Sequence, residues 1–378
     1  MRKKSVTNSH FMSFFIGEKR AQATIFIIIA VLVVAGVLAY ILVKGDLGFV
    51  DVPASIQPAY NSFLSCLEED TLTGISILES QAGYIQLPAF EPGSDYMPFS
   101  SQLDFLGNPI PYWYYVSGNG IQKEQVPTKQ QMELQLGDFV ASKARNCGFD
   151  SYYGQGFEIY LTEPSAAKVS IKDGEVEVNL DMDLSITNGN DTAIVKNHKV
   201  VVNSELGRLY GSAKKVYDEE QKSLFLENYA IDNLRLYAPV DGVEVTCSPL
   251  VWNADDVFNE LQEAIEINTI ALKTKGSSED YFTVDVPGVN EEVRFLNSRT
   301  WAHAFEVSPS DGALLISNPV GNQAGLGILG FCYVPYHHVY SMKYPILVQV
   351  YSSDGNEVFQ FPMAVVIQPI KVGRPVAT

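Results

Sequence analysis

The sequence predicts an α+β protein in which an N-terminal transmembrane helix and a helical neck precede an extracellular body rich in antiparallel strands. Three observations predict this fold. They are an uncharged apolar run at 23–43, apolar residues at helical steps in 55–83 and 128–148, and alternation of apolar and polar residues from 157 onward. We expect the body to be sandwich-like, with inserted helices.

The predicted chain divides into five parts. They are a cytoplasmic leader (1–21), the transmembrane helix (22–43), a helical neck with an aromatic loop (44–155), a β-rich domain with a helical insertion (156–252) and a C-terminal, mostly β domain (253–378).

Composition and charge exclude several classes of protein. The 378 residues are 46% hydrophobic and 19% charged, a balance that favours folded domains over disorder. Lys and Arg number 26 against 44 Asp and Glu, a net charge of -18. Because phosphate binding requires a basic surface, we expect no nucleic-acid partner.

Residues 23–43 form the predicted membrane helix. They run for 21 residues without a charge, and a helix of that length crosses a hydrocarbon core of about 30 Å. Membrane lipid is therefore the first expected partner. The alternative is a cleaved secretory signal peptide, but such peptides have a shorter apolar core, and no A-x-A-like site follows Val43.

Charges around this helix predict its orientation. Five basic residues and one acid precede it, whereas nine acids and no base lie between Lys44 and Lys123. The positive-inside rule therefore places the N-terminus in the cytoplasm and the chain after Lys44 outside the cell. The exterior part holds 20 basic and 43 acidic residues, a charge of about −23.

A second signal stands directly before the apolar run. Gly17–Phe26 places Arg20, the small Ala21 and Gln22 at the start of the helix. This stretch resembles the class III signal peptide of archaeal type IV pilins and pilin-like proteins. The resemblance implies a prepilin-type peptidase as a partner, cleavage between Ala21 and Gln22, and self-assembly of the freed helix into a filament. Phe26 departs from the family, which usually carries a glutamate there. The alternative is an ordinary single-pass anchor.

The exterior part carries a further resemblance. A helix with Cys66 and the stretch Gln81–Ile85 is similar to a group of uncharacterised large surface proteins of small-genome archaea. That resemblance implies a surface location and brings no known activity.

Two helices form the predicted neck. The first begins near Ser55 and Pro58 and ends at Gly83, and its apolar residues make one buried stripe. The second begins at Thr128, which forms a capping box with Gln131. We expect the two helices to pack together, with an irregular, aromatic segment between them.

Strands predominate after the neck. We expect strands at 157–161, 169–171, 176–186 and 193–202, with a hairpin turn at Asp173-Gly174, and then a helical segment over 204–236. A strand over 243–251 and a helix capped by Asn253 follow. The remaining expected strands are 281–286, 293–296, 305–307, 313–316, 344–351 and 358–367, and Pro345 and Pro362 favour edge or strand-end positions for the last two.

Four cysteines in the exterior part predict disulfides. Of the three possible pairings we favour Cys66 with Cys147, which would join the apolar faces of the neck helices, and Cys247 with Cys332 in the distal domain. Closing a loop of about 80 residues stabilises a fold by roughly 4 kcal/mol in the chain-entropy model. Four buried thiols remain an alternative. A metal site is less favoured because no C-x-x-C occurs.

No catalytic motif is present, and we expect neither an enzyme nor a cofactor. The chain has no G-x-S-x-G, H-E-x-x-H, P-loop or Rossmann fingerprint. We expect structural roles for the five histidines. His337 and His338 are adjacent, and neighbouring residues of a strand point to opposite faces, so the two side chains cannot easily bind one metal ion. The histidines are His10, His198, His303, His337 and His338. Asp181 and Asp183 share a strand face, but a solvated face is favoured over Ca²⁺ binding.

Two other features suit a surface protein. Tyrosine-dense stretches at 112–115 and 333–344 offer large contact areas for adhesion, although such residues commonly pack against sheets. Asn190 begins an Asn-Asp-Thr glycosylation sequence. We therefore expect a non-enzymatic surface protein, either a pilin-like filament subunit for adhesion or cell contact, or an anchored envelope or binding module that does not assemble.

Overall fold

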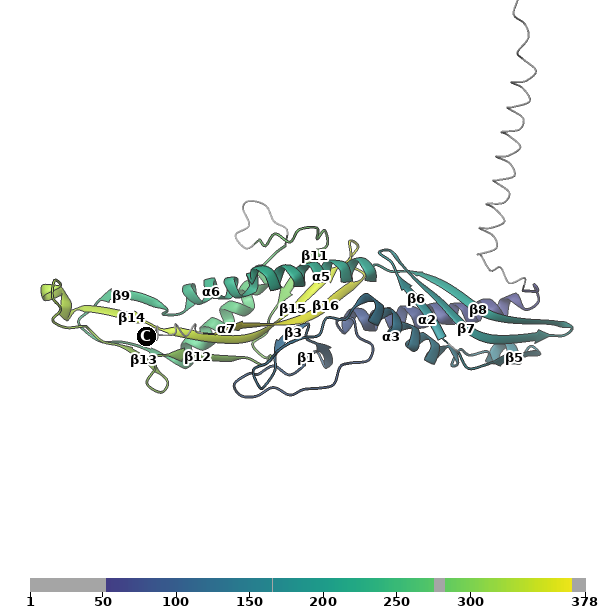
Figure 1. The fold of residues 1–378 in the computed structure, drawn as a ribbon, viewed down its shortest axis with the longest axis horizontal. Coiled ribbons are helices and arrows are strands. Elements are labelled where there is room, and N and C mark those ends of the chain that lie inside the picture. Colours follow the sequence, from purple (N-terminus) through teal and green to yellow (C-terminus); the bar gives the residue numbers. More distant parts are fainter. Residues whose placement is uncertain (1–51, 165, 275–282, 369–378) are drawn as a thin grey trace, which may run out of the picture. The chain divides into compact units, whose positions relative to one another are not determined.

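The computed structural model describes residues 52–164, 166–274 and 283–368, and in these residues the chain is α+β, as predicted (Figure 1). Contacts group Ala54–Thr378 into one unit. The predicted leader and membrane helix, including Arg20, Ala21 and Gln22, lie outside the described residues. None of the helices in the described ranges is both long and apolar enough to cross a bilayer.

Both predicted neck helices are present. α2 (Gln57–Ser80) buries a stripe at intervals of three and four residues. The stripe consists of Ala59, Phe63, Leu67, Thr71, Gly74, Ile75, Leu78 and Glu79. α3 (Lys129–Ala144) begins with the expected capping box, in which the Thr128 hydroxyl accepts from the Gln131 N–H. The two helices pack on one another, as expected.

A four-stranded antiparallel sheet follows the short helix α4 (Asp150–Tyr153). It comprises β5 (Phe157–Leu161), β6 (Ala166–Ile171), β7 (Glu175–Asn188) and β8 (Asp191–Asn203). β7 pairs with all three others: β5 and β6 share one of its edges, and β8 covers the other. The predicted turn at Asp173-Gly174 joins β6 to β7. α3 packs on β6 and α2 on β8 (Figure 1).

His198 lies inside this layer, although its sequence neighbours are polar. The register between β7 and β8 shifts between Asp181 and Leu184, and His198 falls on the buried face. Its ring contacts the rings of Tyr60 and Phe63 of α2. Nε2 lies 3.0 Å from the Met182 carbonyl, and burial lowers the pKa of the imidazole. These contacts fit the structural role that the sequence favours.

The expected helical segment at 204–236 consists of two helices, α5 (Leu206–Ser223) and α6 (Phe225–Tyr237). Leu224 separates them with a left-handed backbone conformation, φ 52°. The buried Glu220 carboxylate accepts a hydrogen bond of 3.0 Å from the Leu226 N–H, which caps the start of α6.

A mixed six-stranded sheet contains most of the C-terminal strands. Its order is β11 (Glu292–Leu296), β15 (Val339–Tyr351), β16 (Val358–Ile367), β3 (Tyr114–Val116) and β4 (Gln122–Glu124), with β12 (Ala304–Ser308) also on β15. β3 runs parallel to β16, and the other pairs are antiparallel. β1 (Gln102–Phe105) and β2 (Asn108–Pro111) form a separate hairpin.

The predicted edge positions of Pro345 and Pro362 are wrong, because both residues lie in interior strands. β12 pairs with β15 as far as Lys343, and β11 pairs with it from Leu347 onward. Pro345 lies opposite the gap between them, so its missing N–H leaves no partner strand unsatisfied. Pro362 lies beside short β3, where its carbonyl accepts from the Trp113 N–H at 2.9 Å.

Two other strand expectations also need correction. Instead of one strand over 243–251, β9 (Asp241–Val245) pairs with β14 (Tyr333–His337), and β10 (Leu250–Asn253) pairs with β13 (Leu314–Ser317). The segment between β9 and β10 contains Cys247. In the segment expected at 281–286, residues 281 and 282 lie outside the described ranges, and Thr283 lies in an isolated bridge to Lys273 instead of a regular strand.

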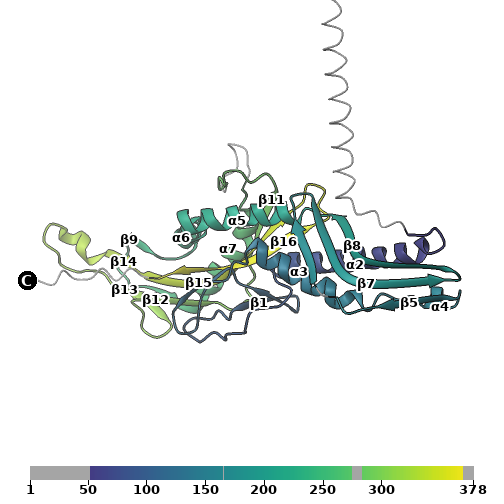
Figure 2. The same ribbon diagram turned by 45° about the vertical axis from the view of Figure 1, so that its right-hand side comes forward.

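Helices cover the sheets in the described residues. α2 and α3 pack on the four-stranded sheet, whereas α5, α6 and α7 (Ala254–Ala271) pack on the six-stranded sheet (Figures 1 and 2). The Asn253 side chain caps α7, as expected. The amphipathic helices therefore take the place that a second sheet would take in the expected sandwich.

A carboxyl pair, in which Glu79 is buried and Glu357 is half-buried, joins three elements of this core. Glu79 of α2 meets Glu357 of the β15–β16 hairpin, and burial, followed by the charge and hydrogen bond of Glu357, raises the pKa of Glu79 to about 9. Glu357 in turn accepts from the Ser204 hydroxyl at 2.9 Å and the Glu205 N–H at 2.7 Å, ahead of α5. Protonated Glu79 therefore helps to hold α2, the hairpin and α5 together.

This pair predicts a stability that falls with rising pH. Between pH values of about 4.5 and 9 the folded chain retains a Glu79 proton that the unfolded chain releases. We expect Glu79→Gln to raise the free energy of unfolding at pH 8 by roughly 1 kcal/mol or more and to weaken the pH dependence. Part of the pH dependence should remain in this variant, because burial and the neighbouring Glu227 also raise the pKa of Glu220. Urea unfolding at a series of pH values measures this.

The matched control is Glu158→Gln, since Glu158 is exposed on β5. If Glu79→Gln and the unsubstituted chain gave equal pH profiles of the free energy of unfolding, the carboxyl pair would not be the source of the pH dependence.

Candidate functional site

The candidate site lies at the end of the unit where β9, β14 and the 3-10 helix η1 (Gly327–Phe331) meet. β9 and β14 form a two-stranded antiparallel ribbon with Val245 opposite Tyr333, and η1 lies directly ahead of β14. The Cys247–Cys332 disulfide joins the chain after β9 to the start of β14. The end of the ribbon is therefore closed by a covalent bond.

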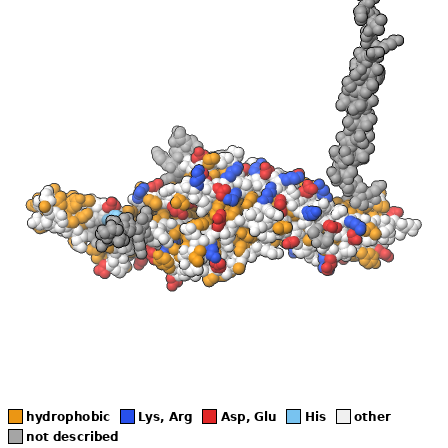
Figure 3. Space-filling model, viewed as in Figure 1, with side chains coloured by type: hydrophobic (Ala, Val, Ile, Leu, Met, Phe, Trp, Pro, Cys, Tyr) orange, Lys and Arg blue, Asp and Glu red, His pale blue; other side chains and the backbone are white. Residues whose placement is uncertain are grey.

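Large apolar side chains cover this tip without a partner in the described residues. Their exposed fractions are 84% for Ile328, 58% for Leu329 and Phe331, 46% for Val243 and 69% for Val245. We use "apolar tip" for these five residues. In Figure 3 hydrophobic side chains gather over the end of the unit formed by β9, β14 and η1. Single exposed apolar residues are ordinary on protein surfaces, but a contiguous group indicates an interaction surface.

Close backbone contacts position the tip. Gly330 is buried, and a Cβ atom there would lie 2.0 Å from the carbonyl oxygen of Gly321. Gly242 of β9 lies against the Tyr336 ring, where a Cβ atom would come within 2.3 Å of the hydroxyl. Because only glycine allows the approach to a backbone oxygen at position 330, η1 packs inward through Gly330, while Ile328, Leu329 and Phe331 are exposed.

The ribbon beneath the tip rests on an aromatic cluster. His338 is buried, contacts the Trp252 ring at 5.8 Å and stacks on Tyr336 at 6.3 Å. Burial lowers the pKa of His338, so the imidazole favours its neutral form. His337 is exposed, 3.8 Å from Asp241. The two histidines therefore lie on opposite faces, as predicted, and do not converge on one ion.

The cysteines pair as the sequence favours. Cys66 of α2 is bonded to Cys147 beyond α3, with a Cα–Cα distance of 5.9 Å, and the second bond is the one in the tip. In the described ranges the one group of three potential metal ligands is Cys66, Asp70 and Cys147, but its two sulfur atoms are bonded to each other.

Other predicted site residues lie apart from the tip. Asp181 borders the irregularity of β7 and Asp183 lies within it, and the Lys196 ammonium lies 3.9 Å from the Asp183 carboxylate. Asn190 is exposed in the turn between β7 and β8, which is compatible with glycosylation. The His303 ring is hydrogen-bonded to the Gln262 side chain, with 2.7 Å between the two Nε2 atoms. His10 lies outside the described residues.

Three of the four aromatic residues in the first tyrosine-dense stretch are too buried for adhesion, and the fourth, Tyr114, is half-buried. Tyr112, Trp113 and Tyr115 are at most 2% exposed, because β3 lies in the six-stranded sheet beneath α5. In the second stretch Tyr340 and Tyr344 are buried, whereas Tyr333 and Tyr336 are half-buried beside the tip.

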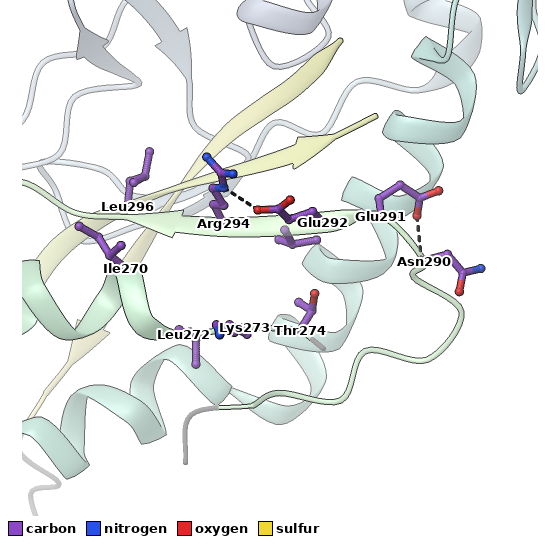
Figure 4. A pocket seen from close by; sticks show the side chains of 10 residues that line it. Ile270, Leu272, Lys273, Thr274, Asn290, Glu291, Glu292, Arg294 and Leu296 are labelled. Atoms are coloured by element: carbon purple, nitrogen blue, oxygen red, sulfur yellow. Dashed lines mark hydrogen bonds and ion pairs between the residues drawn. The ribbon is translucent and has the colours of Figure 1, made fainter. Parts of the chain in front are cut away.

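Hollows also lie elsewhere in the described residues, and two of them have volumes of several hundred Å³. Figure 4 shows one of about 640 Å³ between the end of α7 and β11, where Arg294 donates to Glu292 at 2.8 Å. We assign it no site because it borders residues 275–282, which the structure does not describe. The other, of about 460 Å³, is lined by Trp301, Phe90 and Tyr112 together with polar residues that include Gln102 and Asp104.

Comparison of the chain with protein-family models, with curated proteins and with solved structures finds no match. The function must therefore be inferred from the geometry of the chain itself.

The tip predicts a specific sensitivity at Gly330. Gly330→Ala places a methyl group against a backbone oxygen, so η1 must move, at a cost of about 1–3 kcal/mol. We expect faster hydrogen exchange at the amides of Leu329 and Cys332, which donate within this turn. Gly211→Ala in α5 is the matched control, because a Cβ atom there meets nothing within 4 Å. Unchanged exchange at both amides in Gly330→Ala would rule out the packing role.

Proposed function

We propose that the chain is a membrane-anchored surface protein that makes contact with another surface through its apolar tip. One observation carries this proposal: the described part presents five large apolar side chains on a ribbon end closed by the Cys247–Cys332 disulfide. Disulfides persist in oxidising compartments, which agrees with an exterior location. The proposal is of a binding function, and it assigns no catalytic residue.

The position of the tip supports a role in contact. Ser55 lies beside the β7–β8 turn, since its hydroxyl bonds to Asp191 and its carbonyl accepts from Asn188. Figures 1 and 2 place this turn and the tip at opposite ends of the unit. Only eleven residues lie between Val43 and Ser55, so this linker reaches at most about 40 Å. We propose that this short linker tethers the Ser55 end of the unit to the anchor and leaves the tip free to meet another surface.

Two forms of this function follow from the N-terminal sequence. In the first, a prepilin-type peptidase cuts between Ala21 and Gln22, and the helix at 23–43 assembles a pilin-like filament that carries the tip. In the second, the helix stays in the bilayer as a single-pass anchor. The contact surface is the same in both forms, and the difference lies in how far from the cell it is displayed.

A second candidate function is ligand binding by an anchored module. The hollow beside Trp301 favours it, since Trp301 packs edge-to-face on Phe105 while Gln102 and Asp104 supply polar groups. An aromatic platform with a few polar groups is typical of small-molecule sites. This function would survive loss of the apolar tip, whereas cell contact would not.

The proposal predicts an exposed body and a contact that depends on the tip. Protease added to intact cells should degrade the chain after Gly45 and spare an epitope placed before Arg20, because the charge asymmetry keeps the N-terminus inside. Ile328→Asp should reduce binding between displaying cells and partner cells severalfold. Leu106→Asp is the control, since Leu106 is 87% exposed against 84% for Ile328.

Mass spectrometry of the native N-terminus separates the two forms. A chain beginning at Gln22, whose processing is blocked by Ala21→Trp, would support the filament, whereas one beginning at Met1 would leave the anchored protein. Protection of the body from protease, or equal contact by the two Asp variants, would contradict the proposed function.

A further inference from the structure

We propose that the apolar tip inserts into the interfacial layer of a lipid bilayer, so that the contacted surface is a membrane. This inference rests on the proposed function and names its partner. It follows from the charge pattern of the tip, its backbone hydrogen bonds and the residues that flank it.

The segment that carries η1 and β14 lacks formal charge. Asp311 and Lys343 enclose 31 residues that contain no Asp, Glu, Lys or Arg, and this run includes η1 and β14. A chain that is 19% charged would place about six charged residues there. Charged side chains are costly in hydrocarbon, so their absence is what insertion requires. A protein-binding surface is depleted of charge only at its core, so an uncharged run of this length is not required there.

Three N–H groups in η1 and at its two ends are hydrogen-bonded within the tip. The N–H of Leu326 donates to Gln323, that of Leu329 to Leu326, and that of Cys332 to Leu329, each at 3.1 Å. Backbone groups that enter a bilayer must find partners inside the protein, because hydrocarbon supplies none. Ile328, Leu329 and Phe331 can therefore leave water without exposing these N–H groups to hydrocarbon.

Flanking residues limit the depth of insertion and the choice of lipid. Tyr333 and Tyr336 are half-buried in β14, and tyrosine is enriched at the membrane–water interface. Asp241 and Glu244 are exposed on β9 and give the rim a negative charge. We therefore expect a shallow, hydrophobic insertion that does not require anionic lipid and does not weaken as salt is raised.

The test uses the full chain in nanodiscs of phosphatidylcholine, with incorporation verified by gel filtration. The nanodiscs are mixed with protein-free vesicles, either of phosphatidylcholine or with added phosphatidylserine, and are floated on a density gradient. We expect loaded nanodiscs to float with both kinds of vesicle, at low and high salt, and empty nanodiscs to stay at the bottom. Ile328→Asp should weaken this binding at least tenfold, and Leu106→Asp should leave it unchanged.

The outcomes distinguish failure of membrane insertion from failure of the proposed contact function. Absence of flotation by correctly incorporated chain, or equal binding by the two variants, would overturn insertion. If Ile328→Asp still abolished contact between cells in that case, the tip would bind a protein or glycan and the proposed function would stand. Flotation only with phosphatidylserine, lost at high salt, would also overturn the proposal, since it would indicate electrostatic adsorption.

Discussion

The arrangement of the unit depends on the packing of the buried Trp113 side chain. Its ring is fully buried and stacks on Phe361 of β16 with centroids 3.9 Å apart, while Tyr217 of α5 meets it edge-to-face. The indole N–H donates to the Ala82 carbonyl just beyond α2, at 3.0 Å. One side chain thus joins the end of the neck, the central sheet and the helix that covers it. Because these contacts come from distant parts of the chain, the neck and the C-terminal strands fold against a common core.

That common core leaves the apolar tip as a separate feature. The tip does not share the aromatic packing around Trp113, and it is held instead by the Cys247–Cys332 bond, the β9–β14 ribbon and the approach of Gly330 to Gly321. A disulfide and close backbone contacts can hold a loop in shape without burying its apolar side chains. This separation explains how five large apolar side chains remain exposed on a folded chain.

Sequence patterns among neighbouring residues predicted most of the helices and strands. The features that they did not predict depend on contacts between residues far apart in the chain. The Thr128–Gln131 capping box, the Asn253 cap and the Asp173-Gly174 turn each depend on adjacent residues, and all three are present. The burial of Trp113 depends on residues more than 200 positions away, which periodicity does not reveal. The interior position of Pro345 likewise depends on where β11 and β12 end.

The tip could have been found from the sequence by a different signal. Gly325–Phe331 is apolar, rich in glycine and adjacent to Cys332, inside the longer run without formal charge. Periodicity misses such a segment because it forms neither a regular strand nor a long helix, and glycines separate its apolar residues. Its exposure is not apparent without the fold, since an apolar segment of this length is also typical of a buried strand.

The central claim is that Ile328 enters hydrocarbon when the chain meets a membrane. The most direct measurement is the fluorescence of an environment-sensitive dye attached to Ile328→Cys in the oxidised full chain, with vesicles whose acyl chains carry bromine as a quencher. Insertion predicts a blue shift and strong quenching at this position and neither change at Leu106→Cys, an equally exposed site outside the tip. Emission from Ile328→Cys that stays unshifted and unquenched would contradict it.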